Sequence, residues 1–308
     1  MPCVTSATEH PARLAVGVVG AGKVGAVLGA ALARAGHQVT GVSAVSEESR
    51  ARAEALLSGV PVRAVPDVVA GAELVLLAVP DDVLAGLVSG LARTGAWQAG
   101  QIVVHTSGRH GIGVLGPALA GHVLPLALHP AMTFTGTAMD LDRLADCSFG
   151  VTAPEELRPV AEALVLEIGG SPVWVAEADR PLYHAGLAHG ANHLTTLIAE
   201  ALDVLRAAGI AEPRAVLGPL VQAALDNALR LGDAALTGPV ARGDVETVRE
   251  HLRRLEPLSP EIRATYLALA RAAAARGLDS GRLSPAVVES LIAVLGDPEP
   301  PPDRSTPS

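Results

Sequence analysis

The sequence contains few aromatic residues and almost no cysteine. Only 2% of its 308 residues are Phe, Trp or Tyr although 49% are hydrophobic, so the core must be built from Ala, Val and Leu. The scarcity of rings argues against a protein that stacks the bases of single-stranded nucleic acid. Two cysteines, Cys3 and Cys147, are too few for a disulfide scaffold or a thiolate zinc site. We expect two reduced thiols in a cytoplasmic protein.

Positive charge is scarce as well. The chain has 23 Lys and Arg against 32 Asp and Glu, a net charge of −9, which argues against a non-specific nucleic-acid binder. A small basic pocket for a phosphate is still compatible with this balance. The first 13 residues lack a basic region followed by an apolar stretch, so no secretory signal is predicted. The apolar segment 14–36 carries Lys23 and several glycines, which favours a strand–turn–helix over a membrane span.

The first part of the chain alternates short apolar runs with Ala-rich helical stretches. Several runs are apolar throughout, as in strands covered by helices on both faces. This alternation predicts an α/β fold with a Rossmann-type, doubly wound parallel sheet. Strands are expected at 14–19, 38–43, 62–65, 74–79, 101–105, 123–129, 148–152 and 172–175.

After residue 178 the strand pattern stops, and an all-α C-terminal domain is predicted. Helices are expected at 181–208, 213–231, 245–255, 260–276 and 285–295, three of them with proline in the first turn. The predicted parts are a flexible N-terminal tail (1–12), a dinucleotide-binding domain (13–178), a helical substrate and dimerisation domain (179–296) and a disordered Pro-rich tail (297–308).

A glycine-rich motif follows the first predicted strand. Residues 20–25 form a G-x-G-x-x-G sequence that opens a helix, and a second strand follows at the spacing of a βαβ unit. Gly20 allows the tight turn, Gly22 lets a pyrophosphate approach the backbone, and Gly25 lets helix and strand pack closely. The helix N-terminus supplies amide donors. The predicted cofactor-binding residues of this loop are Gly20, Ala21, Gly22, Lys23, Val24 and Gly25.

The end of the second strand bears on the choice of cofactor. NAD-preferring domains usually place Asp or Glu there to hold the ribose hydroxyls. Here Ser43 stands at the tip, with Ser46 and Arg50 close behind. Hydroxyls and an arginine suit a 2′-phosphate, so these three residues favour NADP over NAD. The glutamates at 47–48 oppose this choice, although they are also expected in the first turn of the next helix.

Further candidate residues stand where other strands end, at the edge of the sheet where ligands bind. Val79 and Pro80 are predicted to form a wall of the pocket for adenine or the nicotinamide ribose. Asp81 or Asp82 is predicted to cap the helix that follows. The next strands end in "HTSG" (105–108) and "HP" (129–130). Two histidines and Ser107 thus converge where chemistry would occur, although a structural hydrogen bond is the alternative role for either histidine.

The helix predicted at 181–208 begins "RPLYHAGLAHGANHLTT". His184, Asn192 and Thr195 share one face, and His189, Asn192 and His193 share an adjoining face. Such a polar run suits a helix that passes close to a ligand, and an exposed polar stripe is the alternative. His189 and His193 have the spacing of a metal pair, but no H-E-x-x-H pattern accompanies them, so no metal site is predicted.

The segment "LTGPVARGD" (236–244) interrupts the helical region. Gly238-Pro239 predicts a turn, and Asp244 is placed to cap the next helix, with Glu246 in its first turn. Nothing points to an extracellular adhesion motif. Thr237 and Arg242 remain, and we predict that they face the substrate cleft, where Arg242 pairs with a carboxylate.

Together these motifs resemble the family that joins a Rossmann-like domain to a helical domain of unknown function. The resemblance covers about residues 14–295 and rests on the dinucleotide loop, "HTSG", "HP", "LYHAGLAHGANHL" and "LTGPVARGD". That family is related to ketopantoate reductases and, more distantly, to 6-phosphogluconate and β-hydroxyacid dehydrogenases. Some members are described as 2-dehydropantoate 2-reductases, which implies a role in pantothenate biosynthesis.

The resemblance also implies roles for individual residues. In hydroxyacid dehydrogenases a serine-containing turn anchors the substrate carboxylate, and Ser107 is similar. Their Lys-x-x-Asn motif corresponds here to His189-Gly-Ala-Asn192, whereas the lysine of ketopantoate reductases corresponds to Ala188. Neither lysine is present, so the mechanism cannot be transferred directly. The related families further imply a homodimer formed through the helical domain.

The sequence therefore predicts an NADP-dependent reductase of a small anionic 2-oxo acid, with ketopantoate as the leading candidate. A histidine would protonate the developing alkoxide. The candidate catalytic residues are His129, His184, His189 and Asn192, and the candidate substrate-binding residues are Ser107, Thr237 and Arg242. The alternatives are a cyclic-imine reductase of the pyrroline-5-carboxylate reductase type and a non-catalytic NADP-binding protein.

Overall fold

The structure, a computed structural model, describes residues 13–296. The predicted tails at 1–12 and 297–308 lie outside the described residues. The chain divides into two compact units, of which the first ends at His189 and the second begins at Gly190. The sequence places the domain boundary after residue 178 instead, and that boundary stays a prediction.

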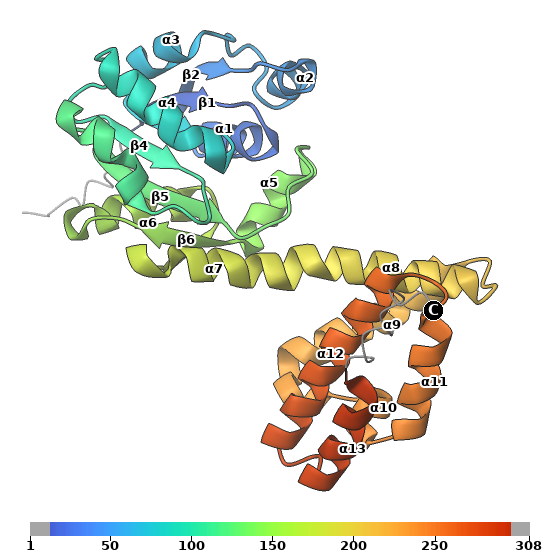
Figure 1. The fold of residues 1–308 in the computed structure, drawn as a ribbon. Coiled ribbons are helices and arrows are strands. Elements are labelled where there is room, and N and C mark those ends of the chain that lie inside the picture. The colour runs from blue at the N-terminus through green and yellow to red at the C-terminus, as the bar shows by residue number, and fades with distance from the viewer. Residues whose placement is uncertain (1–12, 297–308) are drawn as a thin grey trace, which may run out of the picture. The chain divides into compact units, whose positions relative to one another are not determined.

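The first unit is built on a seven-stranded sheet with the order β2-β1-β3-β4-β5-β6-β7 (Figure 1). The strands are β1 (Ala15–Val19), β2 (Gln38–Ser43), β3 (Leu74–Leu77), β4 (Ile102–His105), β5 (Leu124–Pro130), β6 (Ser148–Thr152) and β7 (Ser171–Trp174). β1 lies between β2 and β3, so the chain crosses over at β1 and returns, as in a doubly wound fold. The predicted Rossmann-type fold is confirmed.

Two details of the predicted sheet are wrong. β6 pairs antiparallel with β5, whereas all other neighbouring strands are parallel. The β5–β6 connection contains only the short helix α5 (Met139–Arg143) and a 3₁₀ turn, without the long crossover helix that usually joins parallel strands. The expected strand at 62–65 is reduced to a single bridge between Val42 and Val62.

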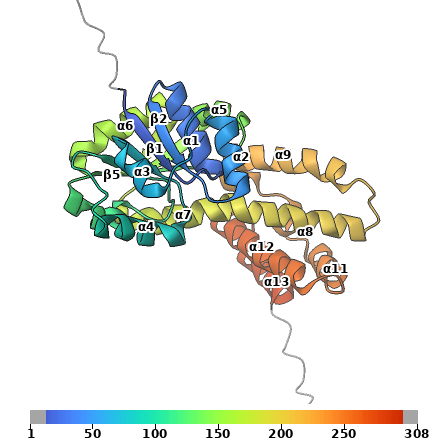
Figure 2. The same ribbon diagram turned by 90° about the horizontal axis from the view of Figure 1, so that it is seen from above.

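Helices cover both faces of the sheet, which explains the strands that are apolar throughout. Leu74 and Leu76 belong to one buried cluster, whereas Val75 and Leu77 belong to the other. Helices α1 (Lys23–Arg34), α2 (Glu47–Leu56) and α6 (Arg158–Glu167) contribute to the first cluster, and α3 (Val65–Ala70), α4 (Asp81–Arg93) and the 3₁₀ segment Ile112–Gly121 contribute to the second (Figure 2).

The second unit is helical. It contains α8 (His193–Ala207), α9 (Pro213–Leu231), α10 (Gly238–Arg242), α11 (Val245–Leu255), α12 (Pro260–Asp279) and α13 (Pro285–Leu295). The helices predicted at 213–231, 245–255 and 285–295 are confirmed, and α12 continues to Asp279 rather than ending at 276. The core of this unit comes from α10 to α13. By contrast, α8 has no buried residue and α9 buries only Pro213.

The helix predicted at 181–208 differs from expectation in one respect. It begins as α7 (Arg180–Leu187), passes through a π-helical turn at Ala188–Asn192, and continues as α8. A π turn widens the helix, so the regular 3.6-residue spacing that predicted shared faces for His184 and Asn192 does not hold across it. The turn coincides with the candidate motif His189-Gly-Ala-Asn192, and π turns of this kind are frequent at functional sites.

The structure confirms the predicted cap of one helix and contradicts that of another. Asp244 caps α11, because its side chain accepts a hydrogen bond from the Thr247 amide. Asp81 and Asp82 do not cap α4; Pro80 is the N-cap, and both acids lie in the first turn, where they face the positive end of the helix dipole. Among residues 13–296, no helix is both long and apolar enough to cross a membrane.

Candidate active site

The glycine-rich loop has the geometry of a close backbone approach. Gly20 has a φ of 100°, which disfavours residues with a side chain. A Cβ on Gly25 would lie 2.0 Å from the Gly20 carbonyl oxygen, so the contact between loop and helix α1 requires glycine there. A Cβ on Gly22 would meet nothing within 4 Å. The loop therefore leaves open space beside Gly22, at the N-terminus of α1.

Ser43 and Ser46 both have structural partners. The Gly20 amide donates to Ser43 Oγ at 3.0 Å, and the Ala21 amide donates to the Ser43 carbonyl at 2.9 Å, so Ser43 holds the loop against β2. Ser46 caps α2 by accepting from the Ser49 amide at 3.2 Å. Their predicted contacts with a cofactor stay predictions. Val79 lies beside this loop, because a Cβ on Gly20 would come within 3.3 Å of Val79 Cγ1.

Sequence reasoning missed an arginine that contacts the loop. Arg52 Nη1 donates to the Ala21 carbonyl at 3.0 Å, whereas Arg50, the predicted residue, is exposed. Both arginines lie on α2, and only the structure distinguishes the one that reaches the loop. A Cβ on Gly136, which follows β5, would come within about 3 Å of both Arg52 and Lys23. Lys23 of the glycine-rich loop and Arg52 of α2 thus place two cationic side chains close together.

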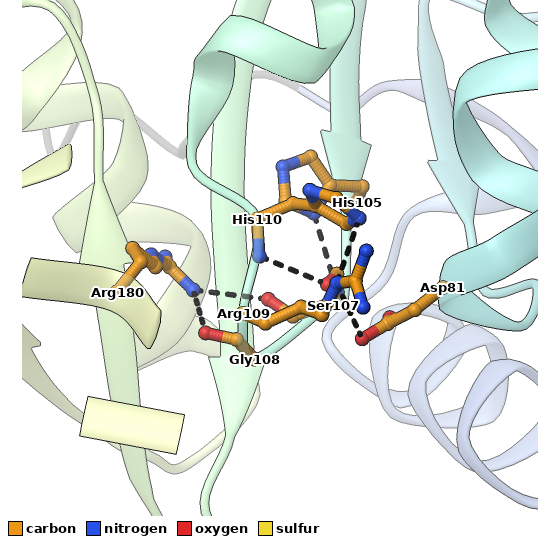
Figure 3. A network of polar contacts seen from close by, with 7 residues as sticks. All are labelled: Asp81, His105, Ser107, Gly108, Arg109, His110 and Arg180. Atoms are coloured by element: carbon orange, nitrogen blue, oxygen red, sulfur yellow. Dashed lines mark hydrogen bonds and ion pairs between the residues drawn. The ribbon is translucent and has the colours of Figure 1, made fainter. Parts of the chain in front are cut away.

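The turn that follows β4 is built around His105 (Figure 3). This side chain is fully buried, and its two ring nitrogens have different partners: the Ser107 amide donates to Nδ1 at 3.2 Å, and Nε2 bonds to the Gly111 carbonyl at 2.9 Å. Nδ1 is therefore the acceptor and Nε2 carries the proton. Burial lowers the pKa of His105 to about 4. His105 thus has a structural role, as a neutral imidazole.

The predicted anchor Ser107 is buried in the same turn. Its Oγ accepts from the His110 amide at 3.2 Å, which leaves its own hydroxyl proton for another partner. Arg109 extends from the turn to His110 Nε2 at 3.1 Å and to Asp81 of α4 at 4.0 Å (Figure 3). Arg109 and Asp81 thus bring two opposite charges to the turn that contains Ser107, at the carboxyl end of β4.

Arg180, at the start of α7, is the largest fully buried side chain of residues 13–296, and its role was not predicted from the sequence. Its guanidinium donates to the carbonyls of Ser107 and Gly108 at 3.0 and 3.5 Å (Figure 3). It also donates to Thr152 Oγ1 and to the carbonyls of Ala127 and Gly150, each at 2.9 Å. No carboxylate of residues 13–296 pairs with it. Arg180 thus connects the turn after β4 to β5 and β6 and brings a buried positive charge beside these strands.

Three rings meet beside this arginine. His129 Nδ1 lies 3.0 Å from Tyr183 Oη, and the His129 ring is perpendicular to both Tyr183 and His184, at centroid distances of 5.6 and 6.0 Å. A Cβ on Gly108 would lie 2.9 Å from His129 Nε2 and 2.5 Å from His184 Cδ2. Burial, followed by the charges of Arg180 and His184, lowers the pKa of His129 to about 4.

The structure therefore brings together His129, His184 and the Ser107–Gly108 turn, all within the first unit. Tyr183 completes this group and was not predicted, although it lies inside the quoted motif "LYHAGLAHGANHL" and is one of only two tyrosines in the chain. His189 belongs to the π turn at the end of the same unit.

The other predicted residues lie in the second unit. Asn192 ends the π turn, and Thr237 and Arg242 are the N-cap and last residue of α10. Both α10 residues are exposed, and Thr237 lines a groove of about 650 Å³ in this unit. The predicted Gly238-Pro239 turn begins α10. The roles of Asn192, Thr237 and Arg242 stay predictions. Residues 13–296 contain no group of three His, Cys, Asp or Glu side chains that could hold a metal ion.

Comparisons with known proteins agree with this architecture. Residues 2–130 match the model of the Rossmann-like domain, and residues 147–273 match that of a domain of unknown function (DUF2520). The chain thus joins a Rossmann-like N-terminal domain to a C-terminal domain of unknown function, as the sequence motifs predict. A search of curated proteins gave no match.

Solved structures share the fold. A Bacteroides fragilis protein described provisionally as an NADP oxidoreductase has 22% identity and a TM-score of 0.70, over 85% of this chain and 98% of its own. An imine reductase from Pseudomonas sp. has 17% identity and a TM-score of 0.62, over 92% and 100%. A Plasmodium falciparum pyrroline carboxylate reductase with NADP bound has 13% identity and a TM-score of 0.56, over 86% and 98%. At these identities the likeness concerns the fold.

Proposed function

We propose that the protein is an NADP-dependent reductase of a small carboxylate-bearing compound, with ketopantoate as the leading candidate. The observation that carries the proposal is that the glycine-rich loop and the His129–His184 pair lie at one edge of the sheet. β1, β3, β4 and β5 run parallel, so the loop after β1 and the imidazole at the end of β5 share the carboxyl edge where ligands bind in such sheets.

The loop suits a dinucleotide phosphate. Gly22 leaves room for a pyrophosphate at the N-terminus of α1, whose first turn contains no acidic residue. Lys23 of the loop and Arg52 of α2 lie close together, and β2 ends without the carboxylate that would favour NAD. Among the similar structures, the P. falciparum enzyme holds NADP. When bound, NADPH would supply the hydride, and this chain's residues would bind the substrate and provide the proton.

The site's electrostatics favour a substrate that is negatively charged. Arg180 adds a buried positive charge without a carboxylate partner, and a fixed positive charge stabilises a carboxylate and a developing alkoxide. It would disfavour a protonated imine, which is cationic. This contrast supports a 2-oxo acid over the second candidate, a cyclic imine, although the imine reductases share the fold. His129 or His184 would protonate the alkoxide oxygen.

The test is turnover by the purified full-length protein. NADPH is mixed with a panel of 2-oxo acids that includes ketopantoate, and with cyclic imines, while the absorbance of the reduced nicotinamide is followed. We expect oxidation with a 2-oxo acid, and a fall in kcat of about 10²-fold or more when the histidine that acts as the acid is replaced by glutamine. Oxidation with imines alone favours the second candidate. Tight NADPH binding without turnover on any compound overturns both.

For the second unit the proposal rests on sequence. Asn192 would hold the carbonyl oxygen, Arg242 would pair with the substrate carboxylate, and Thr237 would face the substrate cleft. Arg242→Ala should raise the KM of an anionic substrate far more than that of NADPH, because a bidentate pair with the carboxylate is lost. Equal effects on both Michaelis constants would argue against this assignment.

A further inference from the structure

We propose that Tyr183 holds His129 in the tautomer with its proton on Nε2, so that the imidazole presents an N–H donor beside Gly108. Tyr183 is then a positioning residue that acts through His129. The use of this donor in catalysis rests on the function proposed above. The tautomer itself is a property of the protein without substrate, and it is measured without any turnover.

The hydrogen bonds of Tyr183 define the direction of its proton. Tyr183 Oη lies 3.0 Å from His129 Nδ1. The imidazole nitrogen Nδ1 is a hydrogen-bond acceptor whenever it carries no proton, and it lies at hydrogen-bond distance from this hydroxyl. The phenol O–H therefore donates to His129 Nδ1.

Both groups are neutral at physiological pH, which leaves a single proton on the imidazole. Burial raises the pKa of Tyr183 above its ordinary value, so the phenol keeps its proton. Burial likewise lowers the pKa of His129 to about 4, so the ring carries one proton rather than two. Because Nδ1 accepts from Tyr183, that proton must be on Nε2.

Two glycines make room for this pair. A Cβ on Gly150 would lie 2.5 Å from Tyr183 Oη, and a Cβ on Gly108 would lie 2.9 Å from His129 Nε2. Neither glycine has a positive φ, so their backbone conformations do not require glycine. Glycine is required here because the rings come close to the backbone. Gly150 leaves room for the Tyr183 phenol, and Gly108 leaves open space beside His129 Nε2.

Arg180 fixes the helix that carries the tyrosine. It precedes Tyr183 by three residues on α7, so the two side chains project from the same side of the helix. The hydrogen bonds of Arg180 to the turn after β4 and to β5 and β6 thereby hold Tyr183 against His129. The charge of Arg180 also favours the ionised phenol, as its effect on the pKa of Tyr183 shows.

This arrangement allows a balanced proton transfer. As the alkoxide oxygen takes the proton from Nε2, the N–H bond breaks and its electron pair stays in the ring. The phenol proton then moves from Tyr183 Oη to Nδ1. The imidazole is again neutral, and the product is a phenolate stabilised by the nearby Arg180 charge. Water returns the proton to Tyr183 after the product leaves.

The chain contains a matched control. Its other tyrosine, Tyr266, also contacts a histidine Nδ1, that of His251, at 2.9 Å, with ring centroids 5.8 Å apart and nearly perpendicular planes. This pair lies in the second unit and has no part in the proposed proton transfer. Tyr183→Phe and Tyr266→Phe therefore remove the same atom from the same kind of pair at two places.

The experiment is nitrogen NMR of the full-length protein labelled with ¹⁵N-histidine. Long-range proton–nitrogen correlations identify the protonated nitrogen of each ring, and His129→Gln assigns the His129 signals by their loss. We expect a proton on Nε2 of His129 in the parent protein. Tyr183→Phe should produce a mixture of both tautomers, because the acceptor bond at Nδ1 is gone. Tyr266→Phe should leave the His129 signals unchanged.

A second variant protects the test against misfolding. Gly150→Ala leaves the hydroxyl in the chain but displaces it from Nδ1, so it should mix the His129 tautomers as Tyr183→Phe does. A proton on Nδ1 in the parent protein, or an unchanged His129 tautomer in both folded variants, overturns the inference. Once a substrate is found, Tyr183→Phe should lower kcat by about 10²-fold with an unchanged Kd for NADPH. Absence of any turnover contradicts the proposed function but leaves the NMR result decisive.

Discussion

Two histidines at neighbouring strand ends are both neutral, yet they differ in what they can do. Both nitrogens of His105 are used within its own turn, so it has no atom left for a ligand. His129 uses only Nδ1, and its Nε2 lies beside Gly108. From the sequence both are simply histidines at the ends of strands. The choice between structure and chemistry depends on where each ring nitrogen finds its partner.

The buried imidazole of His105 makes stability depend on pH. Its pKa falls from 6.5 to about 4 on folding, so the unfolded chain binds the extra proton more readily. The stabilisation is complete above pH 6.5 and decreases as the pH falls toward 4. Between pH 7 and pH 5 we expect His105 to reduce the free energy of unfolding by about 2 kcal/mol. Urea unfolding of the parent protein and of His105→Gln at both pH values measures this difference, and an equal pH dependence in the two proteins would contradict it.

Arg180 should be among the least replaceable residues. Arg180→Met removes all the donors of the guanidinium and leaves buried carbonyl oxygens unpaired, so we expect a loss of stability of about 3 kcal/mol or more. Arg158→Met is the control, because Arg158 is half-exposed, pairs with Glu155 and lies over the Trp174 ring. Its replacement should change stability by about 1 kcal/mol or less. Denaturant midpoints of the two variants give the comparison. Similar losses of stability in the two variants would show that the hydrogen bonds of Arg180 contribute little to the free energy of unfolding.

At the scale of helices and strands, sequence predicted the regular parts well and missed the irregular ones. Proline in the first turn indicated the starts of α9 and α13, and the capping residue Asp244 indicated the start of α11. The π turn at Ala188–Asn192 could not be found this way, because a wider turn leaves no mark in composition. The antiparallel direction of β6 was not predicted for a similar reason, because the apolar pattern of a strand does not depend on the direction of its neighbour.

The same limit applies to the candidate site. The motif sequence indicated Gly20, Gly22 and Gly25, whose positions follow from local geometry alone. Arg180 and Tyr183 were missed, because their partners are distant along the chain: Arg180 Nη1 bonds to Ser107, and Tyr183 Oη to His129. Contacts of this kind depend on how the strands are ordered in the sheet. Sequence periodicity does not define that order.

Two glycines of the nucleotide loop should respond differently to alanine. Gly22→Ala adds a Cβ with nothing within 4 Å, so the protein should fold normally but bind NADPH at least about tenfold more weakly, because the pyrophosphate needs that space. Gly25→Ala places a Cβ 2.0 Å from the Gly20 carbonyl and should lower stability itself. Thermal unfolding and NADPH titration separate the two effects. Unchanged NADPH affinity in Gly22→Ala would remove the loop from the cofactor site.

The cap of α11 offers a smaller test. Asp244 accepts from both the amide and the hydroxyl of Thr247, so Asp244→Ala should cost about 1 kcal/mol of stability. Asp244→Asn keeps an acceptor and should restore most of that loss. Chemical unfolding of the two variants measures the cap, and equal losses would show that the charge matters more than the hydrogen bond.

At the scale of the whole molecule, two helices of the second unit, α8 and α9, bury almost no side chains. α9 buries only its first residue, and Leu220, Leu225 and Leu229 on it are 66%, 38% and 80% exposed. Most helical stability in proteins comes from burial of an apolar face, so an apolar helix left this exposed indicates a further partner surface. We propose that the partner is a second copy of the chain.

We therefore expect a homodimer that depends on α9. Leu220→Glu combined with Leu229→Glu should convert a dimer into a monomer in sedimentation experiments, because charges on a buried apolar surface are unfavourable. Ile292→Glu, at an exposed position of α13, is the control and should leave the assembly unchanged. A parent protein that sediments as a monomer would contradict the expectation.

The buried guanidinium of Arg180 also constrains the order in which the first unit folds. Its acceptors are 73, 53 and 30 residues away along the chain, at Ser107, Ala127 and Gly150. A charge cannot leave water until most of those oxygens are in place, because an unpaired buried cation is strongly disfavoured. The start of α7 should therefore dock only after β4, β5 and β6 have come together. A single side chain thus makes the docking of this helix conditional on the correct assembly of three strands.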